Sequence, residues 1–344
     1  GLAGDALTTG GENVVIGYQA LSTEDGHGRN VAVGNDTLAL LNAGAEGYNT
    51  AVGYSAGFFM TTGVQNTLIG ALAGDAITTG DENTLIGYEA GTAITTAKGS
   101  VAIGYQALRL EDTFGYNVAV GFRALKNQNS NAITYNVAMG YASQESCSSG
   151  RYNVSIGGEA LYANSDGDNN TAIGYNALKT FEADTDGHGG NTAIGSGAMR
   201  DATTATNCVA IGYLALGDGV MTGDNNIGIG LGAGKFITSG VDNVFIGINA
   251  GDAVTEGSHN IGIGKDALSA EDTHGKNVAV GYQALVLQNA GADAYNVAVG
   301  YDSGAAVTTG VNNTIMGGFA GDALTTGSFN TALGYNALST ETTH

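Results

Sequence analysis

The 344-residue sequence has no proline and no tryptophan, only 2 cysteines, and 11 lysines and arginines against 32 aspartates and glutamates. The lack of proline suits a chain in which nearly every backbone N–H joins a hydrogen-bonded ladder. The net charge of −21 argues against binding to nucleic acid or to an anionic membrane surface, because both are contacted through clustered basic residues. No apolar run is long enough to span a bilayer, so we expect no membrane insertion.

The two cysteines, Cys147 and Cys208, are too few and too widely spaced for a disulfide framework, and we expect them to act as small hydrophobic residues. Glycine is abundant, with 58 residues, and 43% of the chain is hydrophobic. The absence of a Gly-X-Y period excludes collagen, and the apolar content is too high for a disordered chain.

A short phrase ending in glycine, such as NTAIG at 170–174, recurs through the whole sequence. We number each repeat from this glycine as position 0. The glycines are Gly17, Gly34, Gly53, Gly70, Gly87, Gly104, Gly121, Gly140, Gly157, Gly174, Gly195, Gly212, Gly230, Gly247, Gly264, Gly281, Gly300, Gly317 and Gly334. Of the 18 spacings between consecutive glycines, thirteen equal 17, three equal 19, one equals 18 and one equals 21. Such a period, with one short β-branched segment in each repeat, predicts one coil of a β-solenoid.

The repeat predicts an all-β fold, a parallel β-solenoid (β-roll) of about 19 coils. It covers 1–344 as a single continuous domain without caps or linker, and its 19-residue coils fall at 34–53, 121–140 and 281–300. Position −4 is Asn in 17 of 19 repeats, which predicts a ladder of stacked amides. The chain begins and ends inside a coil, so we expect a longer chain or end-to-end stacking to continue the solenoid.

The strand positions predict which side chains fill the coil. Position −3 is always Val, Thr or Ile and position −1 is always Ile, Val, Leu or Met, and we expect both to point inward. Position −2 then points outward, yet it carries no charged residue, and Ser155 is its only polar one. A continuous apolar stripe on the outside predicts a partner surface, so we expect self-association along the whole solenoid.

The phrase N-[TV]-A-[IV]-G-Y-x-A-[LG] resembles the head repeats of trimeric autotransporter adhesins. It is equally similar to Gly-rich repeats of phage tail-fibre-like proteins. The resemblance covers essentially the whole chain, and it implies a left-handed β-roll and a homotrimer. The 17-residue coil is longer than a typical adhesin head coil, and we expect no coiled-coil stalk or membrane anchor of the adhesin kind. A triangular solenoid of the hexapeptide type is a structural alternative.

Several residue types recur at fixed coil positions, and each allows a functional and a structural interpretation. The histidines His27, His188, His274 and His344 share one loop register, which is typical of loop structure rather than of a catalytic residue. Acidic residues recur in two loops, as Glu24–Asp25, Glu111–Asp112 and Glu271–Asp272, and as Asp5, Asp75, Asp252 and Asp322. Their oxygens could bind calcium, but we favour solvated charge that keeps fibres from clumping.

Tyrosines and threonines form further rows. Ten of 16 tyrosines lie at +1 and five at −5, namely Tyr48, Tyr116, Tyr135, Tyr152 and Tyr295. Such rows can stack on sugars, but we favour packing against the next coil. Thr61, Thr78 and Thr95 share position +8; an ice-binding array is an alternative, and turn chemistry is the favoured interpretation.

The sequence predicts the structural shaft of an extracellular or virion fibre, adhesin-like or tail-fibre-like, that serves attachment. The expected partner is the chain itself, as a homotrimer with possible end-to-end filaments, and a cell-surface glycan or receptor would meet the variable loops. We expect no enzyme, cofactor or metal site. The alternatives are a monomeric solenoid that presents a Tyr or Thr face to glycan or ice, and an acyltransferase-like solenoid enzyme, which would need a single His in a cleft.

Overall fold

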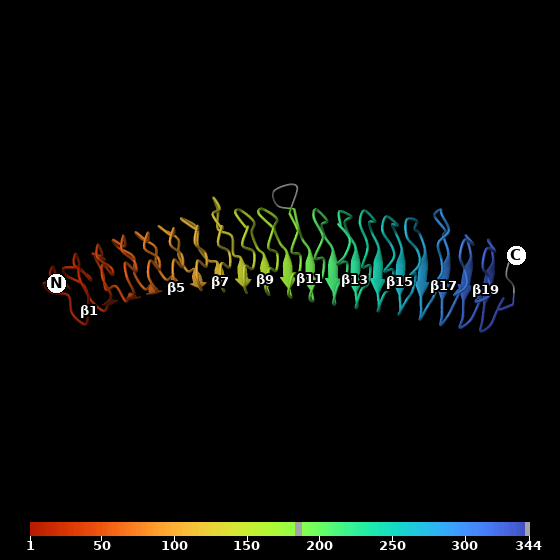
Figure 1. Ribbon diagram of the computed structural model, residues 1–344, viewed down its shortest axis with the longest axis horizontal. Helices are drawn as coiled ribbons and strands as arrows, with labels where there is room; N and C mark the ends of the chain where they lie inside the picture. The colour runs from red at the N-terminus through yellow and green to blue at the C-terminus, as the bar shows by residue number, and fades with distance from the viewer. Residues whose placement is uncertain (183–187, 341–344) are drawn as a thin grey trace. The chain divides into compact units, whose positions relative to one another are not determined.

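The computed structural model describes residues 1–182 and 188–340. The fold is all-β, with short parallel strands that each belong to one coil of a β-solenoid, as the sequence predicts (Figure 1). The strands are β1 Val14–Ile16, β2 Val31–Val33, β3 Thr50–Val52, β4 Thr67–Ile69, β5 Thr84–Ile86, β6 Val101–Ile103, β7 Val118–Val120, β8 Val137–Met139, β9 Val154–Ile156, β10 Thr171–Ile173, β11 Thr192–Ile194, β12 Val209–Ile211, β13 Ile227–Ile229, β14 Val244–Ile246, β15 Ile261–Ile263, β16 Val278–Val280, β17 Val297–Val299, β18 Thr314–Met316 and β19 Thr331–Leu333.

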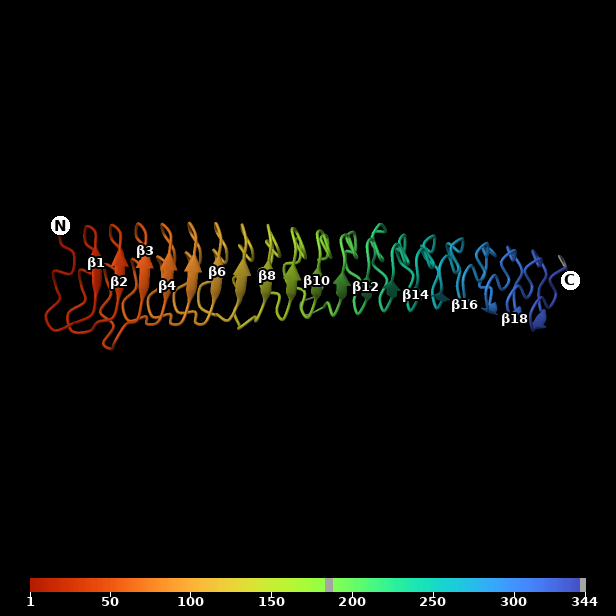
Figure 2. The same cartoon turned by 90° about the horizontal axis from the view of Figure 1, so that it is seen from below.

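The chain forms two compact units. Among the described residues, the first contains 1–170, and the second contains 171–182 and 188–340. The first unit therefore carries β1–β9 and the second β10–β19. Within each unit the strands run in the same direction (Figure 2). The continuity of the two units as one domain and the handedness of the coils stay predictions.

The register of strand pairing follows the repeat length, as the sequence predicts. Thr67 pairs with Thr84 across a coil of the regular length, and Thr171 pairs with Thr192 across the longest coil, so both coils place the same positions side by side. The 19-residue coils do likewise, because Ala32 pairs with Ala51. The additional residues are therefore accommodated in the loops and leave the strand register unchanged.

The predicted asparagine ladder is present. Asn49 Oδ1 accepts hydrogen bonds from the backbone N (3.0 Å) and from Nδ2 (3.3 Å) of Asn66 in the next coil. Asn66 Nδ2 also donates to the carbonyl of Gly80 at 2.9 Å. At one of the two departures from Asn, Cys208 keeps the connection, since its Sγ lies 3.4 Å from the donating backbone N of Asn226. At the other, Ser100, the side-chain Oγ is buried without a hydrogen-bond partner. The ladder thus satisfies backbone groups that the loops would otherwise leave buried without a partner.

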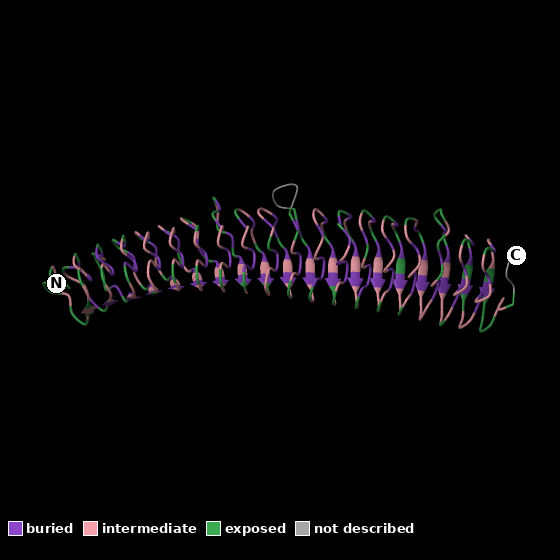
Figure 3. Ribbon diagram, in the orientation of Figure 1, coloured by how far each residue is buried: buried purple, intermediate pink, exposed green. Residues whose placement is uncertain are grey.

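The prediction about the two faces of the strand is wrong. Position −2, not −3 and −1, points into the coil: Ala32, Ala172 and Phe245, for example, have no exposed surface. The residues on either side of it are half-buried or exposed, and Figure 3 shows buried and less buried segments side by side in the strands. The coil interior takes one side chain from each strand, at −2, which is Ala in most coils, rather than two β-branched residues.

Position +4 adjusts to the size of the interior residue. It is Leu in many coils, as Leu178, but Gly251 occupies it next to the large interior Phe245. A Cβ on Gly251 would lie 2.2 Å from the Phe245 ring, and one on Gly74 would lie 2.8 Å from Leu85. Gly at +4 therefore leaves room for a large residue at −2 of the same or the next coil.

The glycine at position 0 is required by the approach of the next coil. At Gly104, φ is +136°, and a Cβ would lie 2.3 Å from the carbonyl oxygen of Gly121. Left-handed backbone also recurs at −5, +2 and +4, where residues such as Tyr116, Gln106 and Leu108 have φ between 51 and 66°. This conformation costs free energy for a residue with a side chain, and hydrogen bonds between coils, such as Gln106 N to Tyr88 O at 2.9 Å, hold it.

Candidate functional surfaces

The outward face of the strands is an uncharged surface, which we call the strand face and define as positions −3 and −1 of every coil. All of its residues are Val, Ile, Leu, Met or Thr. Several are well exposed for aliphatic side chains, including Ile69 at 38%, Met139 at 40% and Met316 at 41%. In a chain with net charge −21, a row of strands without one charged side chain is typical of an interaction surface.

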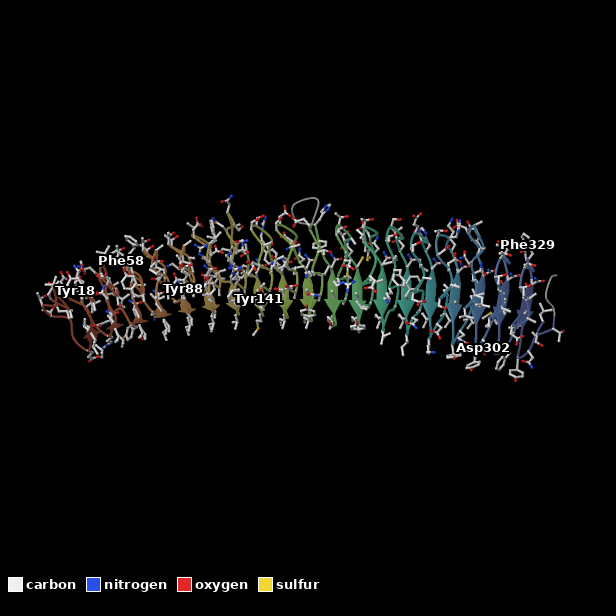
Figure 4. The ribbon with its side chains drawn as sticks, in the orientation of Figure 1. Tyr18, Phe58, Tyr88, Tyr141, Asp302 and Phe329 are labelled. Carbon is white, nitrogen blue, oxygen red and sulfur yellow. The ribbon has the colours of Figure 1, made fainter. Side chains whose placement is uncertain are left out.

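An aromatic row follows the strand face at position +1. In the first unit, consecutive ring centroids are 5.6 Å apart for Tyr88–Tyr105, 5.1 Å for Tyr105–Phe122 and 5.3 Å for Phe122–Tyr141, and the rings are within 14° of parallel. Figure 4 labels Tyr88 and Tyr141, which lie near the strands of this unit. Sugars stack on open ring faces, but here each ring covers the face of the next. This geometry favours the packing interpretation of the row.

A second aromatic row lies at position −5. Tyr116, Tyr135 and Tyr152 stack with centroids 5.8 and 6.1 Å apart. Elsewhere in this row a tyrosine ring forms a cation–π contact: the Lys276 Nζ lies 5.2 Å from the centre of the Tyr295 ring. Both residues of this contact belong to loops, and a cation–π contact at an exposed site contributes modestly to stability.

The interpretation of the loop glutamates as solvated charge is wrong. Glu24, Glu111 and Glu271 have no exposed surface, because they occupy the core row at +7 that holds Met60 and Ile77 in other coils. Glu24 Oε1 accepts from the backbone N of His27 at 3.1 Å, and Oε2 accepts from the backbone N of Ala43 at 3.2 Å.

The position of these glutamates in the chain explains their burial. Each lies in the coil before a 19-residue coil. Ala43, the donor to Glu24, lies in the loop of such a longer coil. The Glu24 carboxylate therefore accepts hydrogen bonds from backbone N–H groups, including one in the longer loop, whose path differs from that of the regular loops. Burial raises the pKa of Glu111 to about 8 and that of Glu271 to about 7.

Two of these loops bring potential metal ligands together. Ligand atoms of Glu24, Asp25 and His27 lie within 4.8 Å of one another, and so do those of Glu271, Asp272 and His274. In the first group both Glu24 oxygens already accept backbone hydrogen bonds, so this carboxylate is committed to the fold. The equivalent loop with Glu111 has Phe114 in place of the histidine. The remaining loop histidine, His188, is exposed, and His344 lies outside the described residues.

The threonine row is part of the ladder between coils. The hydroxyl of Thr61 donates to the carbonyl of Thr78 at 3.1 Å, that of Thr78 to Thr95 at 3.1 Å, and that of Thr95 to Asp112 at 2.9 Å. These hydroxyls have their partners within the protein. This favours the turn interpretation over an array that orders water.

The cysteines are buried, as expected of small hydrophobic residues, but both also form hydrogen bonds, Cys208 with Asn226 and Cys147 with Gln128. Cys147 and Cys208 are free and fully buried. Burial raises the pKa of each thiol to about 12, so neither is a reactive thiolate near neutral pH.

The first unit also contains a pocket that the sequence did not predict. Its volume is about 290 Å³, and it is lined by Asp36, Tyr54, Ser55, Phe58, Phe59, Leu72 and Asp75. The repeat offered one signal for it: Phe58 and Phe59 are consecutive aromatic residues at +5 and +6, where the next coil has Asp75 and Ala76. We call it the Phe59 pocket.

These features define the protein as a parallel β-solenoid repeat protein with an uncharged strand face. Comparison with known proteins adds no family, since no family model, no curated protein and no solved structure matches the chain. Within residues 1–182 and 188–340, no helix is both long and apolar enough to cross a membrane.

Proposed function

We propose that the chain is the shaft of an extracellular or virion fibre that serves attachment, in which three copies pack through their strand faces. The observation that carries this proposal is the uncharged strand face, which continues through all strands of each unit. The number three comes from the resemblance of the repeat to trimeric adhesin heads and tail fibres. Because the side chains at position −2 point into the coil, they cannot form the interface that the sequence predicted. The proposed interface is instead the strand face, at positions −3 and −1.

The period of the strand face favours a second copy of the chain as its partner. A partner that covers strand after strand must repeat its own apolar side chains at the same spacing of about 4.8 Å, and another copy does so. The acidic side chains that give the net charge lie outside the strand face. Copies that meet there therefore keep most of their like charges apart.

The area of the strand face is sufficient for a specific contact. The first unit has nine strands. At about 4.8 Å between strands and about 10 Å for the three strand residues, they present roughly 430 Å², and the ten strands of the second unit present roughly 480 Å². Two chains that meet through the strand faces of both units would bury roughly 1,800 Å², which lies within the ~1,200–2,000 Å² of a specific interface.

Lysine on the strand face tests the proposal. Met139→Lys with Ile156→Lys places two charges on adjacent exposed strands, β8 and β9. We expect this variant to keep its circular dichroism spectrum and to lose its assembled mass in light scattering, because a buried unpaired charge is costly. The matched control, Thr62→Lys with Thr79→Lys, puts two lysines on exposed loop positions and should stay assembled. A folded double variant with the assembled mass of the wild type would refute the interface.

A further inference from the structure

We propose that the Phe59 pocket binds an organic ammonium ion, held between the rings of Tyr54, Phe58 and Phe59 and the carboxylates of Asp36 and Asp75. This site is separate from the strand-face contacts on which the proposed fibre rests. The ligand class is an alkylammonium or quaternary ammonium group small enough for a pocket of about 290 Å³.

The pocket has open aromatic walls. Tyr54 is 56% exposed and Phe59 50% exposed, and the Phe58 ring meets the Phe59 ring edge-on, with centroids 4.7 Å apart and planes at 88°. Figure 4 labels Phe58 in the first unit. Unlike the stacked row from Tyr88 to Tyr141, Tyr54 has no aromatic neighbour at +1, since Asn35 and Ala71 precede and follow it. Its ring face is therefore free for a cation.

The two carboxylates of the pocket lack a cation from the protein. Within the described residues, neither Asp36 nor Asp75 has Lys, Arg or His at ion-pair distance, and no basic residue lines the pocket. Asp36 Oδ2 accepts one hydrogen bond from Asn35 Nδ2 at 2.7 Å. Asp75 Oδ1 is buried without a donor. Burial raises the pKa of Asp75, and the backbone N–H groups of Asp75 and Ala76 act against this shift.

The second unit contains part of this arrangement, with its own cation and with Leu214 and Leu231 in place of Asp36 and Tyr54. Counted from Gly230, Lys235 takes the place of Phe58, Phe236 that of Phe59, and Asp252, in the next coil, that of Asp75. The Lys235 Nζ lies 4.7 Å from the centre of the Phe236 ring and 3.0 Å from Asp218 Oδ2.

This internal comparison shows what the first unit lacks. At the same coil position an ammonium group, a phenyl ring and a carboxylate already meet in this fold. The carboxylate comes from a different position in each unit, since Asp218 lies at +6 and Asp36 at +2 of the preceding coil. In the first unit a third aromatic wall, Phe58, replaces the lysine, so an ammonium group at this place would come from a ligand.

Saturation-transfer NMR on the full chain tests the proposal with n-butylammonium, tetramethylammonium and, as the uncharged counterpart, n-butanol. We expect transfer to one or both ammonium ions, at least fivefold stronger than to n-butanol, and we expect it to fall with salt. Phe58→Lys is the decisive variant, because it recreates the pair that Lys235 forms with Phe236 and supplies an internal ammonium group. This variant should fold like the wild type and lose at least four fifths of the signal.

Matched substitutions distinguish binding in the Phe59 pocket from non-specific binding elsewhere on the protein. Phe59→Ala should lose the signal, whereas Phe236→Ala, at the same position of the second unit, should keep it. Equal transfer to n-butanol would show an apolar pocket without charge recognition and would overturn the proposal. A signal that survives Phe58→Lys in a folded protein, or no ammonium signal in the wild type, would overturn it as well.

Discussion

Asn66 and Asn83, in neighbouring coils, are joined by two hydrogen bonds. The Asn66 Oδ1 accepts from the backbone N of Asn83 at 2.9 Å and from its Nδ2 at 3.2 Å. Asn83 in turn donates to the Ala97 carbonyl at 2.9 Å and accepts from the Ser100 backbone N at 3.0 Å. One side chain thus connects three coils, and repetition of this unit holds the stack together.

Removal of one amide from this ladder should be costly. In Asn83→Ala, the buried Ser100 N–H and Ala97 carbonyl lose their side-chain partner, and each unsatisfied group costs about 1–3 kcal/mol. We expect the free energy of unfolding to fall by about 3 kcal/mol in urea denaturation. The control Asn35→Ala removes an amide outside the ladder, at a position that is not buried, and should change it by less than about 0.5 kcal/mol.

A methyl group at the coil glycine should be poorly tolerated. In Gly104→Ala the Cβ would lie 2.3 Å from the Gly121 carbonyl oxygen, at a φ of +136°. We expect a loss of about 3 kcal/mol or more, because backbone strain and steric overlap act together. Gly11→Ala is the comparison, since no atom lies within 4 Å of its added Cβ. Equal melting temperatures for the two variants would contradict the role of the glycine row.

The direction of the strand residues can be tested with two adjacent lysines. Ala172 is fully buried, whereas Ile173 lies on the strand face. Ala172→Lys should lower the melting temperature strongly, because it forces a charge into the core. Ile173→Lys should keep the fold and weaken assembly. The reverse outcome, a folded Ala172→Lys and an unfolded Ile173→Lys, would show that the strand points the other way.

The buried glutamates predict a dependence of stability on pH. The pKa of Glu111 is raised from 4.5 to about 8 and that of Glu271 to about 7, so the folded protein binds these protons more tightly than the unfolded chain. Their contribution is most favourable below pH 4.5 and declines as the pH rises toward 7 for Glu271 and 8 for Glu111.

The matching variant is Glu111→Gln, which removes the titrating group. The difference in unfolding free energy between pH 5 and pH 8 should be smaller in Glu111→Gln than in the wild type, by roughly 1.4 kcal/mol for each pH unit over which Glu111 titrates. The measurement is urea denaturation at a series of pH values. Identical pH profiles for the two proteins would contradict a buried, protonated Glu111.

The repeat made most of the fold predictable. The glycine spacing located every strand, and the recurring position of Asn predicted the amide ladder that Asn49 and Asn66 form. The faces of the strands were not predictable in the same way. A short strand such as TAI at 171–173 is apolar on both sides, so its pattern does not distinguish the interior, which takes one side chain from each strand, here Ala172.

The burial of the glutamates and the Phe59 pocket both depend on contacts between neighbouring coils. They cannot be predicted from the sequence of one loop considered alone. Glu24 stands beside Asp25 and looks like part of a solvated acidic pair, yet it occupies the core row that Met60 fills two coils later. Aligning the +7 positions of all coils would have identified it. The Phe59 pocket required both the neighbouring coils and the comparison with Lys235 in the second unit.

The solution mass of the wild-type chain tests the central claim most directly. Light scattering on a size-exclusion peak should give three times the 34.4 kDa of one chain if the strand faces of three copies pack together. A mass of two chains would keep the interface and contradict the number three. A single species of 34.4 kDa at micromolar concentration would contradict self-association through the strand face and, with it, the proposed fibre.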